Sequence, residues 1–130
     1  MLFRSRAGLQ AITRYERELV VHLLDRLAEI PGITVYGITD RDQLDHRTSI
    51  VSLTMEWSTP TRAATHLGAE GIQVWDGDFY AVNPVAALGL AERGGLLRVG
   101  LMSYNTDDEV ARLLASLTRL AATAPAAARA

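Results

Sequence analysis

An arginine stands in the middle of an apolar run near the C-terminus of the chain. Arg98 lies within residues 96–102, where a guanidinium group is costly to bury unless it has a partner. Two structural interpretations are an ion pair with a nearby carboxylate and simple exposure on an open sheet face. A functional interpretation is a carboxylate-binding site, because the planar guanidinium fork matches a carboxylate with two parallel hydrogen bonds. The residue and its neighbours leave all three interpretations open.

A second group of residues that could do chemistry lies in the segment 75–80, which reads Trp-Asp-Gly-Asp-Phe-Tyr. The segment is rich in aromatic and turn-forming residues and follows a predicted strand, and loops held by a rigid scaffold often carry function. Its candidate residues are Asp76, Gly77, Phe79 and Tyr80. The alternative is a tight corner whose aromatic rings pack on the core, and the segment by itself favours neither interpretation.

Composition and spacing exclude several kinds of chemistry. The chain contains no cysteine, which excludes disulfides, thiolate ligands and a cysteine nucleophile. All 13 basic residues are arginine, so no side-chain amine can form a Schiff base. His22, His46 and His66 lack metal-ligand spacing, and no metal site is predicted. The net charge of −2 gives no reason to expect nucleic acid or an anionic membrane as a partner.

The elements that would position these residues are predicted from apolar periodicity and from capping residues. The predicted helices cover residues 11–30, 60–67, 84–88 and 107–120, and their expected caps are Thr59, Asn83 and Thr106. The predicted strands cover residues 33–36, 48–55, 72–75 and 96–102, with a loop at 39–47 and a turn at 76–78. Thr106 and Glu109 have the spacing of a capping box.

The order of these elements predicts an α+β fold (an α/β sandwich). It consists of one sheet of about four strands with long helices packed on one face. In the last strand Leu97 and Val99 alternate with Arg98. If the helices cover the apolar side of the sheet, the Arg98 side chain emerges from the opposite face.

One domain is expected, with a segment of different composition at each end. Residues 1–10 continue poorly into the helix predicted from residue 11 and are interpreted as a leader that could be foreign to the domain. Residues 11–120 form the domain, and the alanine-rich residues 121–130 are expected to be a disordered tail. No apolar run approaches the roughly 18–20 residues needed to span a bilayer, so no membrane segment is predicted.

Two segments together resemble a known family. Residues 97–106, Leu-Arg-Val-Gly-Leu-Met-Ser-Tyr-Asn-Thr, look like the closing motif of class V enzymes that use pyridoxal phosphate (PLP). Residues 71–81 are similar to the active-site loop segment of these enzymes, and in particular to a cysteine desulfurase-like subfamily with a W-D-G-x-F-Y pattern. Over residues 11–120 the chain resembles the C-terminal small domain of a fold type I enzyme of the class V aminotransferase and cysteine desulfurase group.

The resemblance implies a role for each candidate residue. Arg98 matches the arginine that holds the α-carboxylate of the amino-acid substrate. Asp76, Gly77, Phe79 and Tyr80 match the active-site loop, which lines the entrance to the site. Tyr80 stands where true cysteine desulfurases have their nucleophilic cysteine, so the usual persulfide route is closed here.

The resemblance also implies what this chain does not supply. The Schiff-base lysine, the groups that hold the PLP phosphate and the acid that pairs with the pyridine nitrogen belong to a large N-terminal domain. The expectation is a cytoplasmic, homodimeric parent enzyme, of transaminase or desulfurase/lyase type, in which this chain contributes no catalytic residue and is inactive alone. The alternatives are a standalone, non-catalytic module that binds a small acid or a protein, and a vestigial product without function.

Overall fold

The computed structural model describes residues 2–124, which form a four-stranded sheet and the helices that pack on it. The helices are α1 (Leu2–Ala28), α2 (Pro60–Ala69), α3 (Val82–Ala87) and α4 (Asp107–Thr123), and the 3-10 helices are η1 (Arg41–His46) and η2 (Ala91–Arg93). The strands are β1 (Ile33–Tyr36), β2 (Ile50–Met55), β3 (Trp75–Gly77) and β4 (Leu96–Gly100). Among these described residues no helix combines the length and the apolar character that crossing a membrane requires.

The strands lie in the order β1-β2-β4-β3, and every neighbouring pair is antiparallel. The central strand β4 therefore has β2 on one side and the short strand β3 on the other. This sheet confirms the predicted α+β class and the predicted number of strands.

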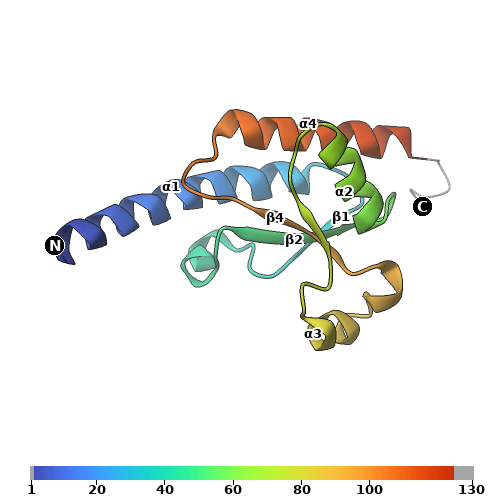
Figure 1. Cartoon of the computed structure of the whole chain (residues 1–130), viewed down its shortest axis with the longest axis horizontal. Helices are drawn as coiled ribbons and strands as arrows, with labels where there is room; N and C mark the ends of the chain where they lie inside the picture. The colour runs from blue at the N-terminus through green and yellow to red at the C-terminus, as the bar shows by residue number, and fades with distance from the viewer. Residues whose placement is uncertain (1, 125–130) are drawn as a thin grey trace.

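The main hydrophobic core lies between the sheet and the long helices. In Figure 1, α1 and α4 lie above the sheet, with α2 beside α4. Alternate residues of β2 and β4, among them Leu53 and Leu97, face these helices and are fully buried with Leu23, Leu27 and Leu117. The predicted packing of the long helices on one face of the sheet is confirmed. The helices pack there because the alternation of the strands gives this face its apolar side chains.

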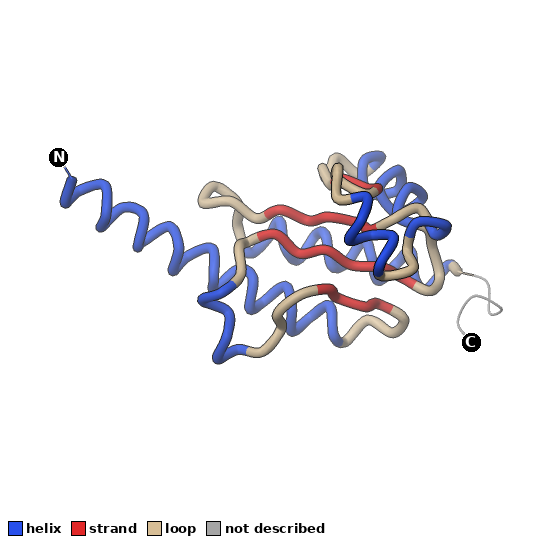
Figure 2. Tube along the Cα trace, turned by 90° about the horizontal axis from the view of Figure 1, so that it is seen from below, coloured by secondary structure: helices blue, strands red, loops and turns tan. Residues whose placement is uncertain are grey.

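The opposite face carries a smaller cluster. α3 lies below the sheet in Figure 1, and in the view from below the strands lie in front of the long helices (Figure 2). Val85, Leu90 and Leu96 are buried together there, with Tyr36 and Phe79 packed against them. α3 and η2 therefore cover the second face near Leu96. The short helix was predicted at residues 84–88, but its packing on this face was not.

The first helix is longer than predicted. α1 begins at Leu2 rather than at residue 11, so the predicted leader boundary at residue 10 falls inside a continuous helix. Residues 2–10 include good helix formers such as leucine, arginine and alanine, which extend a helix without an apolar stripe to bury. This end projects beyond the sheet (Figures 1 and 2). Of the predicted tail, residues 121–123 belong to α4 and Ala124 is buried, whereas residues 125–130 lie outside the described residues.

The predicted third strand is displaced. It was expected at residues 72–75, but β3 comprises Trp75–Gly77, so the turn expected at 76–78 is partly strand. Ile72 and Val74 pack against the main core instead of pairing in the ladder. Asn83 was expected to cap a helix, but it lies inside α3, whose N-cap is Ala81. The expected caps Thr59 and Thr106 are confirmed.

Candidate functional site

Arg98 projects from the sheet face opposite the main core. In the ladder it stands beside Ser52 of β2 and Trp75 of β3, while its chain neighbours Leu97 and Val99 are buried under the long helices. The side chain itself is half-buried. The alternation of the strand thus sends the guanidinium to the face that the sequence pattern predicts.

The partners of Arg98 are aromatic rings. Its Cζ atom lies 4.9 Å from the ring centroid of Trp75 and 4.8 Å from that of Phe79. Within residues 2–124 it has no carboxylate partner at ion-pair distance. Cation–π contacts of this kind are worth about 0.5–1 kcal/mol at exposed sites. The ion-pair interpretation of Arg98 is therefore wrong, and no hydrogen bond within residues 2–124 uses its guanidinium N–H groups.

The segment after β3 has an unusual backbone. Phe79 and Tyr80 have φ values of 54° and 63°, the left-handed region that is costly for side chains with a Cβ. The Asp78 carboxylate accepts a hydrogen bond from the Tyr80 N–H at 3.0 Å, and the Asp78 carbonyl accepts one from the Ala81 N–H at 2.7 Å. This turn brings the Phe79 ring to Arg98 and leaves Tyr80 92% exposed.

The other two loop candidates do not face Arg98. Asp76 accepts a hydrogen bond of 2.6 Å from the Thr61 hydroxyl of α2, which places its carboxylate on the helix-covered side of the sheet. Gly77 pairs with Leu96 at the end of the ladder. Of the four candidates in this segment, the structure brings only Phe79 to the arginine.

Trp75 is the residue that the sequence reasoning missed as a site candidate. It belongs to the aromatic segment, but its contact with Arg98 depends on the antiparallel register that pairs the two residues. The rings of Trp75 and Phe79 also meet each other, edge to face, with centroids 6.3 Å apart and planes 82° apart. A correct register between β3 and β4 would have been needed to predict this cluster.

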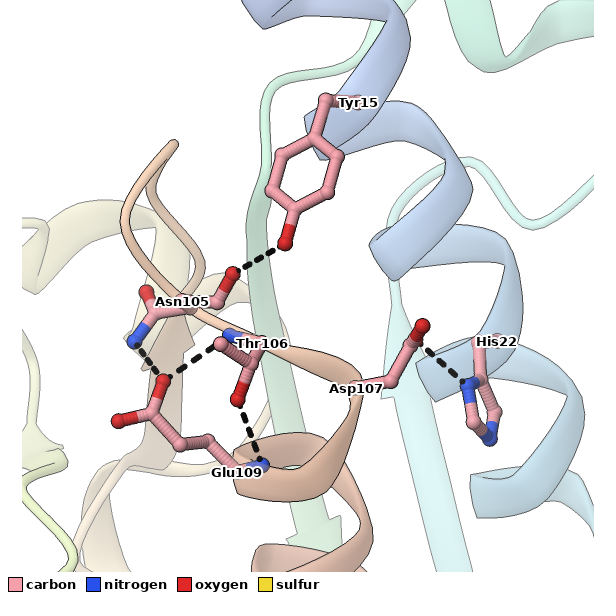
Figure 3. A network of polar contacts seen from close by, with 6 residues as sticks. All are labelled: Tyr15, His22, Asn105, Thr106, Asp107 and Glu109. Atoms are coloured by element: carbon pink, nitrogen blue, oxygen red, sulfur yellow. Dashed lines mark hydrogen bonds and ion pairs between the residues drawn. The ribbon is translucent and has the colours of Figure 1, made fainter.

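The Tyr-Asn-Thr motif after β4 has a structural role. Figure 3 shows that the Tyr15 hydroxyl of α1 donates to the Asn105 carbonyl, at 2.6 Å, and that the Asn105 side-chain amide donates to the Glu109 carboxylate, at 3.1 Å. The Asn105 side-chain oxygen also accepts a bond of 2.8 Å from the Met102 N–H. Asn105 thus closes the turn after β4 and connects it to both long helices.

Thr106 and Glu109 form the predicted capping box at the start of α4. The Thr106 N–H donates to the Glu109 carboxylate at 3.0 Å, and the Glu109 N–H donates to the Thr106 hydroxyl at 3.3 Å (Figure 3). The hydrogen bonds from the Asn105 side chain and the Thr106 backbone lower the pKa of the Glu109 carboxyl. Beside this cap, Nδ1 of His22 in α1 lies 3.2 Å from the Asp107 carboxylate (Figure 3).

The remaining polar groups and cavities do not add to the Arg98 cluster. In residues 2–124 no group of three or more histidine, aspartate or glutamate side chains is placed to hold a metal ion. A cavity of about 430 Å³ lies between the ends of α1 and α4, beside Trp57, Ile30 and Leu114. It is lined by other residues than those around Arg98, so the candidate site is the sheet face with its aromatic pair.

The fold and the closing motif define a class of protein. The sequence model of the family described as Aminotransferase class-V matches residues 1–113. The chain belongs to this family. The match includes residues 2–10, which are continuous with the rest of α1.

Similar proteins point to one branch of the family. The chain is 32% identical to a cysteine desulfurase of Synechococcus elongatus, over 89% of this chain and 17% of that protein. It is also 32% identical to a cysteine desulfurase of Salmonella newport, over 87% of this chain and 26% of that protein. The chain therefore spans about a quarter or less of the length of these curated relatives.

Solved structures share the fold. The apo structure of a cysteine desulfurase from Thermococcus onnurineus superposes with a TM-score of 0.81 and 27% identity, over 92% of this chain and 28% of that one. A cysteine desulfurase from Escherichia coli gives a TM-score of 0.73 at 24% identity, over 87% of this chain and 26% of that one, which shows the fold alone.

Proposed function

We propose that this chain is the C-terminal small domain of a PLP-dependent class V enzyme that acts on an amino acid, and that Arg98 binds the α-carboxylate of the substrate. The observation that carries the proposal is a half-buried arginine whose guanidinium faces away from the core and, within residues 2–124, has two aromatic rings and no carboxylate as partners. Its N–H groups are available for two parallel hydrogen bonds to a carboxylate. In this proposal Phe79 and Tyr80 lie at the entrance of the site, and Asp76 and Gly77 hold β3 in place.

The residues of this chain do not fit a covalent PLP site. A Schiff base needs a primary amine, and the chain has no lysine. The part of the site that is present is suited to a carboxylate and not to the cofactor. We therefore expect the lysine to be supplied by a large N-terminal domain, and we expect this chain to be inactive alone.

The residues of the segment 75–81 lack the thiol that the cysteine desulfurase activity named for the relatives would use. A cysteine desulfurase that works through a persulfide needs a thiol, and this chain has no cysteine. Tyr80, at the tip of the strained turn, offers a phenol instead. The proposal therefore includes transamination, β-elimination or epimerisation of an amino acid, and excludes transfer of sulfur through a cysteine of residues 75–81.

The proposal extends to the intact protein. We propose residues 11–120 as the body of the small domain, a PLP-binding large domain before it, a homodimer, and a cytoplasmic location. The family membership supports the large domain, since the relatives are several times longer than this chain. A lysine-bearing large domain in the upstream reading frame is the expected genetic observation. An upstream frame without one would favour a standalone binding module.

Carboxylate binding can be tested on the 130-residue chain by NMR. L-alanine should shift the Arg98 Nε–Hε signal and the backbone amide signals of residues 96–100 in ¹⁵N-labelled protein, and L-alaninamide, which lacks the carboxylate, should shift neither. The Arg98→Gln variant, which keeps a polar side chain but loses the charge and the guanidinium, should lose the shifts of the backbone amide signals of residues 96–100 on addition of L-alanine. Arg93→Gln is the matched control, because Arg93 is an exposed arginine of η2. An unchanged response in Arg98→Gln would refute the proposed site.

Inactivity of the isolated chain needs a separate test. Purified chain is mixed with PLP and amino acids, and loss of the amino acid is followed over time. No turnover above that of PLP alone is expected, because the chain has no lysine to hold the cofactor. Sustained turnover by the 130-residue chain well above the rate of PLP alone would overturn the proposal that the reactive centre lies elsewhere.

A further inference from the structure

We propose that Trp75 and Phe79 are positioning residues that hold the Arg98 guanidinium ready for a carboxylate. This inference rests on the proposed function of Arg98 and adds the means by which its orientation is fixed. The two rings come from different local structures, Trp75 from β3 and Phe79 from the turn after it. Both nevertheless lie within 5 Å of the same Cζ atom, at 4.9 and 4.8 Å.

The angle between the rings restricts the guanidinium in two directions. The ring planes are 82° apart, so a planar guanidinium can lie flat on only one ring and must meet the other with its edge or at an angle. One contact therefore limits the tilt of the group, and the second limits its rotation in the plane. A single ring would leave one of these motions free.

Each ring is itself fixed by the fold. Trp75 is held by its ladder position opposite Arg98, although 53% of the residue is exposed. Phe79 packs against the buried cluster of Val85, Leu90 and Leu96. The left-handed φ of Phe79 is costly for a residue with a Cβ, and such strain persists only where the surroundings impose it.

Holding the arginine in advance favours binding for a physical reason. A long, flexible side chain loses rotamer freedom when it is immobilised by a ligand, at a cost of about 0.5–1.5 kcal/mol. If the rings have already restricted the Arg98 side chain, less rotamer entropy is lost when the carboxylate binds. Ring faces also leave the N–H groups unused, whereas an ion pair to a carboxylate of the chain would occupy them.

The test compares aromatic with aliphatic substitutions at each position of the 130-residue chain. Trp75→Phe and Phe79→Tyr keep a ring, whereas Trp75→Leu and Phe79→Leu keep apolar bulk but remove the ring face. The probe is acetate, with acetamide as its neutral counterpart. Binding is followed through the Arg98 Nε–Hε signal and, so that Arg98→Gln can be compared, through the backbone amide signals of residues 96–100. The leucine variants should bind acetate about two- to tenfold more weakly than wild type, and the aromatic variants should stay close to it.

A second readout separates positioning from a merely structural role. The order parameter of the Arg98 Nε–Hε bond should fall in the leucine variants and be retained in the aromatic ones, while the backbone spectrum of the core stays unchanged. Leu88→Ala, which removes another half-exposed apolar side chain (51% exposed) on the α3 side, is the control and should alter neither quantity. If one leucine variant fails to fold, the other still tests the positioning role, because the proposal requires both rings to hold Arg98.

The outcomes distinguish the two levels of the proposal. If wild type responds to acetate as to acetamide, or if Arg98→Gln responds like wild type, Arg98 is not the carboxylate site and the proposed function fails. If Arg98 binds acetate, but the leucine and aromatic variants have the same acetate affinity and the same Arg98 Nε–Hε order parameter, only the positioning role is overturned. Weaker binding and a lower order parameter in the leucine variants alone support the positioning role.

Discussion

The carbonyl oxygen of Gly77 lies so close to the Cα of Gly95 that a Cβ at residue 95 would come within 2.2 Å of it. Gly77 pairs with Leu96 at the end of the β3–β4 ladder, and Gly95 is the residue just before Leu96. Gly95 also has a φ of 79°, a conformation that residues with a Cβ adopt at a cost. This close approach brings β3, and with it Trp75, against the strand of Arg98.

Gly95→Ala should therefore destabilise the fold more than an ordinary glycine substitution. The strain of the positive φ and the clash of the new Cβ with a backbone carbonyl are separate effects. Together they should lower the free energy of unfolding by about 2–4 kcal/mol. Urea denaturation followed by tryptophan fluorescence measures this change. Gly37→Ala is the matched control, because Gly37 has a φ of 95° but nothing within 4 Å of its added Cβ. Equal losses in the two variants would contradict the close approach.

Acid stability should depend on Glu109. The hydrogen bonds from Asn105 and Thr106 lower the pKa of Glu109 in the folded state, so the unfolded chain takes up the proton first. The contribution of Glu109 is present above the ordinary glutamate pKa of about 4.3 and is lost as the pH falls through the lowered folded pKa. Glu109→Gln should flatten this acid-side loss, since glutamine can still accept the bond of a capping box.

The measurement is the unfolding free energy between about pH 6 and pH 2.5, followed with urea at each pH. Glu70, whose pKa is lowered chiefly by the hydrogen bond from Arg119, acts in the same direction, so Glu109→Gln should remove only part of the slope. Glu92→Gln is the control, because within residues 2–124 Glu92 has no ion pair with a basic residue. A slope that Glu109→Gln leaves intact would speak against the role of this carboxylate.

The turn at Tyr80 should become more stable with glycine. Tyr80 is exposed and has a φ of 63°, which costs a residue with a Cβ about 1–2 kcal/mol, while glycine adopts it freely at an entropic cost of about 0.5–1 kcal/mol. Tyr80→Gly should therefore raise the unfolding free energy by up to about 1 kcal/mol. Tyr80→Ala keeps the Cβ and should give no gain, and a gain of the same size in both variants would show that strain is not the cause.

Local patterns were sufficient for much of the architecture. The caps at Thr59 and Thr106 and the capping box with Glu109 depend on residues within one turn, and they form as expected. The alternation around Arg98 likewise determined which face of the sheet receives the guanidinium, because successive residues of a strand point to opposite sides. The closing motif around the same arginine also pointed to the family to which the chain belongs.

What the sequence alone determined, then, is the set of features that neighbouring residues decide: caps, strand alternation, and the absence of lysine and cysteine. Only the tertiary structure decided that Trp75 stands opposite Arg98, that β3 is displaced to Trp75–Gly77, and that Phe79 turns onto the guanidinium. These features depend on the register between strands distant in sequence and on a left-handed turn held by its surroundings. A pattern read within a few residues contains no information about either, because both are set by contacts across the fold.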